Sequence, residues 1–276
     1  MTAAADMIHD LQDAHLMVRF ELRKHLRRKR LYIAFGIAIA LPMLFLIIPL
    51  LFGRDFADTA KSFASSNLNF ISTLIIISGA IFAGDSVSSE FERKTGLMLF
   101  PTPQRRTSIF IGKYVAALLA LFAVVTFYYL ITVGEIVSIY GMSEIPMEIG
   151  KSFLMAILYS TSVMSVMFFF SSVMKRTITS SLIGFFLLMM IMPILTMILT
   201  AVDVDPWFML TQNASLISDV LAQSSGGFGP MNHGGPDQAR FNTYSPDFLL
   251  GSIVITAYTM ILLWIGLYIA NRRRME

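Results

Sequence analysis

The chain has 276 residues, of which 55% are hydrophobic and only 14% are charged, and its mean hydropathy is +0.68. Soluble domains carry about 25% charged residues, so the composition excludes a water-soluble globule and predicts an all-α polytopic membrane protein. The net charge of +3 is too small to indicate a nucleic-acid partner, and the chain has no cysteine for disulfides or thiolate metal sites.

Residues 1–30 precede the first long apolar stretch and predict an N-terminal amphipathic interfacial helix. Apolar residues recur every three or four positions at Met7, Leu11, Ala14, Val18 and Leu22, which gives one apolar face. The other face is basic, and we expect it to lie against membrane lipid phosphates. Alternatively, these charges only fix the topology. The candidate interfacial residues are Arg19, Arg23, Lys24, Arg27 and Arg28.

Six stretches of residues 31–276 are apolar and contain no Asp, Glu, Lys or Arg. About 20 apolar residues are needed to cross a bilayer as a helix. The predicted six-helix transmembrane domain therefore has spans at residues 31–53, 62–84, 114–134, 152–174, 177–202 and 248–270. Pro193 predicts a kink in the fifth span.

The lysines and arginines are distributed unevenly between the two sides of these spans. Residues 1–30, 85–113, 175–176 and 271–276 carry 17 of the 21, and the other side carries four. Because positive residues concentrate on the cytoplasmic side, we expect both termini to be cytoplasmic in a multi-pass protein of the cytoplasmic (cell) membrane.

Residues 85–113 form the longest predicted cytoplasmic connection. Ser89 and Glu92 match a capping box, and Gly96 is expected to end the helix that follows. We therefore predict a short polar helix under the membrane, with an ordinary solvated loop as the alternative. Its exposed charges would be Glu90, Glu92, Arg93 and Lys94.

The predicted external segment, residues 203–247, divides in two. Trp207–Ala222 is moderately apolar and predicts one or two short helices at the outer membrane face. Ser224–Pro236 is rich in glycine and has the composition of a flexible loop.

The predicted spans contain no carboxylate, lysine, arginine or histidine, which disfavours a proton-driven carrier. The phosphate-binding pattern G-x-x-x-x-G-K-[S/T] is also missing, because Tyr114 follows Lys113. We expect no catalytic residue, metal site or cofactor in this chain, and energy for any pumping would come from a partner.

Two cytoplasmic segments resemble type-2 ATP-binding-cassette (ABC) transporter permeases. Arg19–Leu31 (RFELRKHLRRKRL) is similar to that family's approach to the first span. Glu92–Lys113 (ERKTGLMLFPTPQRRTSIFIGK) is similar to its pattern of an acidic residue, a glycine turn, a proline–arginine element and Gly-Lys. Gly96-Leu97 stands where Gly-Thr is commoner.

The resemblance implies a second permease subunit and a separate cytosolic ATPase that binds ATP and Mg. Residues 1–30 would be the connecting helix, and Asp85–Gly96 would be the coupling helix of an exporter. The implied ATPase contacts are Asp85, Ser89, Glu90, Glu92, Arg93, Lys94 and Gly96.

Two alternatives remain open. The chain could be a stand-alone carrier or channel with a solute path along the fourth and fifth spans. It could also be a membrane anchor or assembly factor that recruits a cytosolic protein through residues 85–113. Transport by the pure chain in liposomes would favour the first alternative, and binding without any flux would favour the second.

Overall fold

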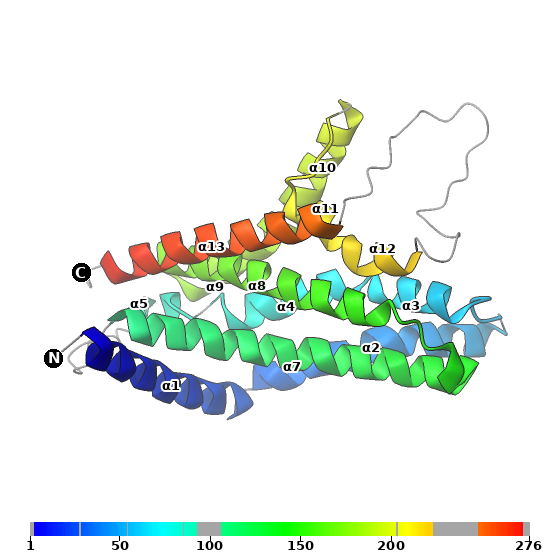
Figure 1. The fold of residues 1–276 in the computed structure, drawn as a ribbon, viewed down its shortest axis with the longest axis horizontal. Coiled ribbons are helices and arrows are strands. Elements are labelled where there is room, and N and C mark those ends of the chain that lie inside the picture. The colour runs from blue at the N-terminus through cyan, green and yellow to red at the C-terminus, as the bar shows by residue number, and fades with distance from the viewer. Residues whose placement is uncertain are drawn as a thin grey trace.

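The protein is all-α and polytopic. The computed structural model describes residues 3–27, 29–53, 55–84, 86–92, 106–202, 204–222 and 248–272, and these ranges contain no strand. Six helices are long and apolar enough to cross a membrane, which confirms the predicted fold class. Both ends of the chain lie at the same end of the bundle (Figure 1), as an even number of spans requires.

All six predicted spans are present, and two short helices lie in the segment for which one or two were expected. The helices of the first half are α1 (Ala3–Arg27), α2 (Lys29–Phe52), α3 (Ala60–Leu68), α4 (Ile71–Phe82), α5 (Ser88–Glu92) and α7 (Arg106–Tyr140). Those of the second half are η1 (Met142–Glu144), α8 (Ile149–Val173), α9 (Thr177–Phe186), the π-helical turn η2 (Leu187–Ile191), α10 (Met192–Ala201), α11 (Leu210–Ala214), α12 (Leu216–Ala222) and α13 (Phe248–Arg272).

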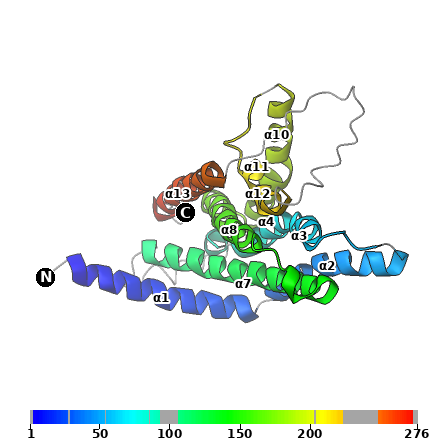
Figure 2. The ribbon, with the colours of Figure 1, turned by 45° about the vertical axis from the view of Figure 1, so that its right-hand side comes forward.

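Two of the six spans are interrupted. The second span breaks between α3 and α4, where the polar residues from Ser65 to Asn69 dilute the apolar run. The fifth span contains the π-helical turn and then Pro193 in the first turn of α10. Both features interrupt the regular helical hydrogen bonds. The fifth span changes direction, as Pro193 predicted, and α10 points away from the bundle in both views (Figures 1 and 2).

Helix α7 is longer than its predicted span at both ends. The charge-free criterion placed the span at residues 114–134, because Lys113 and Glu135 flank it. Both side chains are only 3% exposed and belong to the 35-residue helix. The prediction that ionisable groups stay outside the spans is therefore wrong for this helix, since partners from other helices allow these two groups to be buried.

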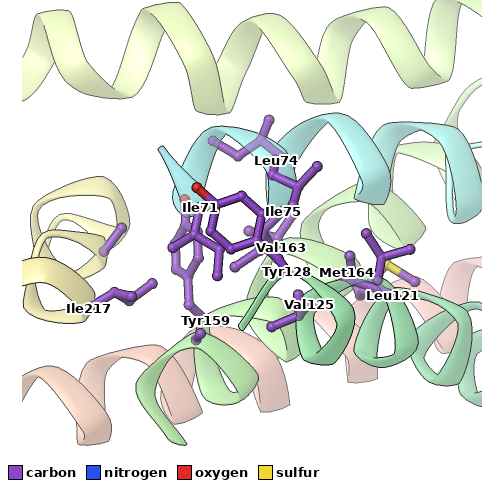
Figure 3. Packing of buried hydrophobic residues seen from close by; sticks show 14 of the residues in the cluster. Ile71, Leu74, Ile75, Leu121, Val125, Tyr128, Tyr159, Val163, Met164 and Ile217 are labelled. Atoms are coloured by element: carbon purple, nitrogen blue, oxygen red, sulfur yellow. The ribbon is translucent and has the colours of Figure 1, made fainter. Parts of the chain in front are cut away.

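The apolar core lies where α4, α7 and α8 meet (Figure 3). Its central side chains come from all three helices, and α12 closes one end of the cluster with Ile217. The labelled members are Ile71, Leu74, Ile75, Leu121, Val125, Tyr128, Tyr159, Val163, Met164 and Ile217. In contrast, α2, α10 and α13 turn large apolar side chains outward, as helices that face lipid do.

The charged residues distinguish the two ends of the bundle. One end holds both termini, and we call it the basic end. The described basic side chains outside the opposite end belong to α1 and the start of α2 (Arg19, Arg23, Lys24, Arg27, Lys29 and Arg30), to the early part of α7 (Lys113), to the connection before α9 (Lys175 and Arg176) and to the last residue of α13 (Arg272). The opposite end carries Lys61 and Lys151 together with Asp58, Glu144 and Glu148. The basic end is thus the end for which the sequence predicts a cytoplasmic location.

Candidate functional site

The short helix α5 lies at the basic end and is fastened to α8. The backbone N–H groups of Val87 and Ser88 donate to the Ser171 hydroxyl oxygen over 2.9 and 3.1 Å. A helix of five residues cannot satisfy its own first amides. Ser171, in the last turn of α8, therefore accepts the hydrogen bonds that hold the start of α5 in place.

A buried ion cluster joins α5 to α1 and α7. The Lys113 ammonium lies 2.6 Å from the Glu90 carboxylate and 2.9 Å from that of Glu21. Lys24 contacts Glu21 over 3.0 Å at the edge of the cluster, where solvent reaches it. We call Glu21, Lys24, Glu90 and Lys113 the Lys113 cluster. Its two acids and two bases balance, which is the condition for burying charges in a protein interior.

The ionisation of Glu21 reflects this pairing. Burial alone would raise the pKa of its carboxyl, but the ammonium groups of Lys113 and Lys24 outweigh that effect and hold the pKa below its ordinary value. Because the pKa is lowered in the folded state, the stabilisation is present above the ordinary glutamate pKa. It is lost only as the pH falls through the lowered pKa.

Glu92 connects α5 to α9. Its carboxylate accepts the backbone N–H of Thr177 over 2.8 Å and also the Thr177 hydroxyl. The predicted capping box is wrong, because Ser89 lies inside α5 rather than before it. The physical reason is that α9 presents free amides at its own N-terminus, and Glu92 satisfies one of them.

The structure separates Glu90 from Glu92, the two predicted acidic contacts that it describes. Glu92 is exposed, as predicted. Glu90 is only 7% exposed, so the prediction that it is solvated is wrong, because its carboxylate is turned inward to Lys113. Ser89 is partly buried. The remaining predicted residues, Asp85, Arg93, Lys94, Gly96 and Arg28, lie outside the described residues.

Helix α1 packs lengthwise along α7 through a stripe that recurs every fourth residue, formed by Met17, Glu21 and His25. The His25 ring meets Phe82 edge-on, with 5.7 Å between ring centroids. Val18 and Leu22 from the predicted apolar face are only half-buried. The buried stripe therefore differs from the predicted apolar face. It includes Glu21 and His25, because Glu21 pairs with Lys113 of α7 and the His25 ring packs on Phe82 of α4.

The opposite side of α1 is exposed and both apolar and basic. Leu16 and Phe20 point outward beside the three exposed arginines, while Lys24 is half-buried against Glu21. This combination is typical of a helix that contacts the interface of a membrane. The exposed arginines are Arg19, Arg23 and Arg27.

Sequence reasoning missed three members of this site. Glu21 and Lys113 are 92 residues apart in the chain, and Ser171 lies 84 residues from Val87. Single-sequence periodicity carries no information on such pairs. The one hint in the sequence that Lys113 matters was the Gly112-Lys113 dipeptide at the start of the third span, which is part of the resemblance described above. In the described part of the chain, no three His, Asp or Glu side chains gather as a metal site would require.

Replacing Ser171 by alanine is expected to release α5. The change removes the acceptor of two buried amides, and an unsatisfied buried amide costs about 1–3 kcal/mol. Because the chain has no native cysteine, Ser89→Cys introduces a single thiol on α5. This thiol should react faster with a water-soluble maleimide in the Ser171→Ala background than in the background with Ser171 intact. Ser160→Ala is the matched control, since Ser160 is equally buried in α8 but donates to Ala156 of its own helix. Equal labelling rates in both backgrounds would contradict the anchoring role of Ser171.

Helix α5 is therefore a junction. Its backbone is held by α8, Glu90 is bound to α1 and α7 through the Lys113 cluster, and Glu92 binds α9. A force applied to α5 would reach all four helices through short polar contacts. This arrangement can transmit a displacement from the basic end into the bundle.

Comparison with curated proteins gave no match. The profile of one protein family, described as "Protein of unknown function (DUF2705)", matches residues 20–274. The matched range begins in α1 and ends just beyond α13, so it includes the α5 junction and all six spans. The chain therefore belongs to this family, DUF2705.

Proposed function

We propose that the chain is the permease subunit of an ABC transporter in the cytoplasmic membrane. It would export a substrate with energy from a separate cytosolic ATPase, which binds the ATP and Mg. The observation that carries the proposal is the α5 junction, because a five-residue helix at the basic end is tied by side chains to α1, α7, α8 and α9. The resemblance of residues 19–31 and 92–113 to type-2 permeases supports it independently.

In this proposal the ATPase binds the exposed surface around α5. Ser89 and Glu92 contribute to that surface, whereas Glu90 acts from inside by holding α5 to Lys113. Movement of the ATPase on binding ATP would displace α5 and, with it, the helices to which α5 is bound. Since the polar contacts are short and largely buried, the displacement would be passed on rather than absorbed at the surface.

The membrane-facing surfaces fit the other proposed partners. The outward apolar side chains of α2, α10 and α13 suit lipid and a second permease subunit. The arginines on the exposed side of α1, next to Leu16 and Phe20, suit anionic headgroups.

Site-specific cross-linking tests the ATPase contact. The chain has no cysteine, so Ser89→Cys introduces a single thiol on α5 and leaves the Glu92–Thr177 contact in place. A bifunctional thiol-to-amine reagent, applied to native membranes with and without ATP, should join this position to a protein that carries the P-loop and signature motif of an ABC ATPase. Mass spectrometry of the cross-linked band identifies that protein.

Met147→Cys is the matched control, because Met147 is 95% exposed but lies at the opposite end of the bundle. We expect no ATPase adduct from it. An ATPase adduct from both positions, or from neither, would contradict the assignment of α5 as the contact.

One observation favours a second candidate function, a stand-alone carrier. Glu135 of α7 is buried inside the bundle, where the sequence had predicted no ionisable group. Such groups are common in the proton pathways of carriers. Substrate uptake by liposomes that contain only this chain, driven by a pH gradient and lost on addition of a protonophore, would support the carrier over the ATPase-dependent permease.

A further inference from the structure

A buried carboxylate lies between α3 and α7, far from the α5 junction. Glu135 is only 3% exposed. One of its oxygens, Oε2, accepts a hydrogen bond of 2.9 Å from the Asn67 side-chain amide. The other oxygen, Oε1, is buried and has no hydrogen-bond partner among the described residues. Among the described residues, only one of the two carboxyl oxygens of Glu135 is therefore hydrogen-bonded.

The orientation of Asn67 is fixed by Tyr128. The Tyr128 hydroxyl lies 2.8 Å from the backbone carbonyl oxygen of Asn67 and 2.7 Å from its side-chain oxygen. Because both of these atoms are acceptors, the hydroxyl is the donor. This leaves the Asn67 amide nitrogen to donate to Glu135. Asn67 belongs to the last turn of α3, directly before the break in the second span. The negative end of the α3 dipole therefore adds no compensation for a carboxylate charge.

No cation among the described residues compensates Glu135. Lys61 of α3 is already paired with Glu148 over 2.9 Å. The other charged or titratable groups on the elements at this end form neither an ion pair nor a hydrogen bond with Glu135. They are Asp58 before α3, Tyr128, Tyr129 and Tyr140 of α7, Lys151 and Tyr159 of α8, and Asp219 of α12.

These contacts indicate the protonation state of Glu135. An ionised carboxylate buried without a cation is strongly unfavourable, and such a group takes up a proton instead. A sodium ion would need several oxygens around it, but the Tyr128 hydroxyl already lies against both oxygens of Asn67 and shares its one proton with them. We propose that Glu135 is a proton-binding site that carries its proton on the free oxygen Oε1 and releases it only when water reaches the α3–α7 interface.

Infrared spectroscopy of the full chain in lipid nanodiscs tests this site. At about pH 6 an ordinary glutamate, with a pKa near 4.3, is ionised. The wild type should nevertheless show the C=O stretching band of a protonated carboxylic acid, shifted by D₂O exchange and lost as the pH is raised. Glu135→Gln should lack this band. Because the experiment uses the chain without any ATPase, its outcome is independent of the proposed transport partner.

Two control variants assign the band. Glu144→Gln changes an exposed glutamate at the same end and should leave the band intact. Burial also raises the pKa of the Asp219 carboxyl. Asp219→Asn therefore shows whether any part of the band comes from Asp219. An absent band in the wild type, a band unchanged in Glu135→Gln, or a band removed by sodium at constant pH would each overturn the proposal.

The pH dependence of stability gives a second readout. If the folded chain holds a proton that the unfolded chain releases, the ratio of folded to unfolded protein falls by up to tenfold per pH unit as the pH rises. Glu135→Gln, which mimics the protonated form, should remove this part of the pH dependence and raise the thermal midpoint relative to the wild type under alkaline conditions. A wild-type midpoint that equals that of Glu135→Gln at every pH would also overturn the proposal.

Discussion

Replacing Lys113 by methionine is expected to destabilise the protein by about 3–5 kcal/mol, which is the usual cost of removing one partner from a buried ion pair. Methionine fills similar space but leaves the carboxylates of Glu21 and Glu90 facing each other without the ammonium between them. Because these two acids belong to α1 and α5, both elements should detach from α7. The measurement is the midpoint of thermal unfolding in detergent, followed by limited proteolysis of the released α1.

Lys24→Met is the matched control for this change. Lys24 also pairs with Glu21, but its side chain is 30% exposed, and pairs of this kind contribute about 0–1 kcal/mol. A third variant, Lys113→Met with Glu21→Gln and Glu90→Gln, removes all three charges and should recover much of the lost stability. If Lys113→Met and Lys24→Met have the same small effect, the Lys113 cluster does not hold the junction together.

Replacing Gly79 by leucine is expected to separate α4 from α8 and to cost about 1–3 kcal/mol by overpacking. A Cβ atom at Gly79 would lie 2.8 Å from a methyl carbon of Val163, a short β-branched side chain that cannot swing away. The sulfur of Met164 lies close behind, so a larger side chain has nowhere to go. The thermal midpoint should fall, and the purified yield should fall with it.

Gly36→Leu serves as the comparison for Gly79. Gly36 lies in α2, and an added Cβ there meets nothing within 4 Å. Since glycine is unfavourable inside a helix, this change should be neutral or slightly stabilising. Equal losses of stability for both variants would show that the close approach of α4 to α8 is not what limits side-chain size at Gly79.

The sequence was sufficient to predict the spans because their signal is local. Twenty apolar residues without a charge identify a membrane helix without knowledge of its neighbours. The same criterion failed at the ends of α7, where Lys113 and Glu135 were treated as boundaries although both lie inside the helix. Whether a charge can be buried depends on partners that are distant in the sequence, and a single sequence does not reveal them.

The candidate site was predicted as a segment but not in its contacts. A short helix between the second and third spans was expected, and α5 is present there. Its acidic residues divide into an inward Glu90 and an outward Glu92, a difference that hydropathy and capping rules cannot resolve. The same limit applies to α1, whose buried stripe contains Glu21 and His25 rather than apolar residues alone.

The most direct test of the account is the distance between the η1–α8 connection and α10, while ATP acts at the basic end. Spin labels on Met147→Cys and Met197→Cys occupy exposed positions in this cysteine-free chain. In the non-covalent complex with the ATPase that cross-linking identifies, addition of ATP and Mg should shift the distance distribution measured by pulsed electron paramagnetic resonance. The Ser171→Ala variant should reduce this shift. An identical distribution with and without ATP would contradict the proposal that α5 transmits the ATPase cycle into the membrane helices.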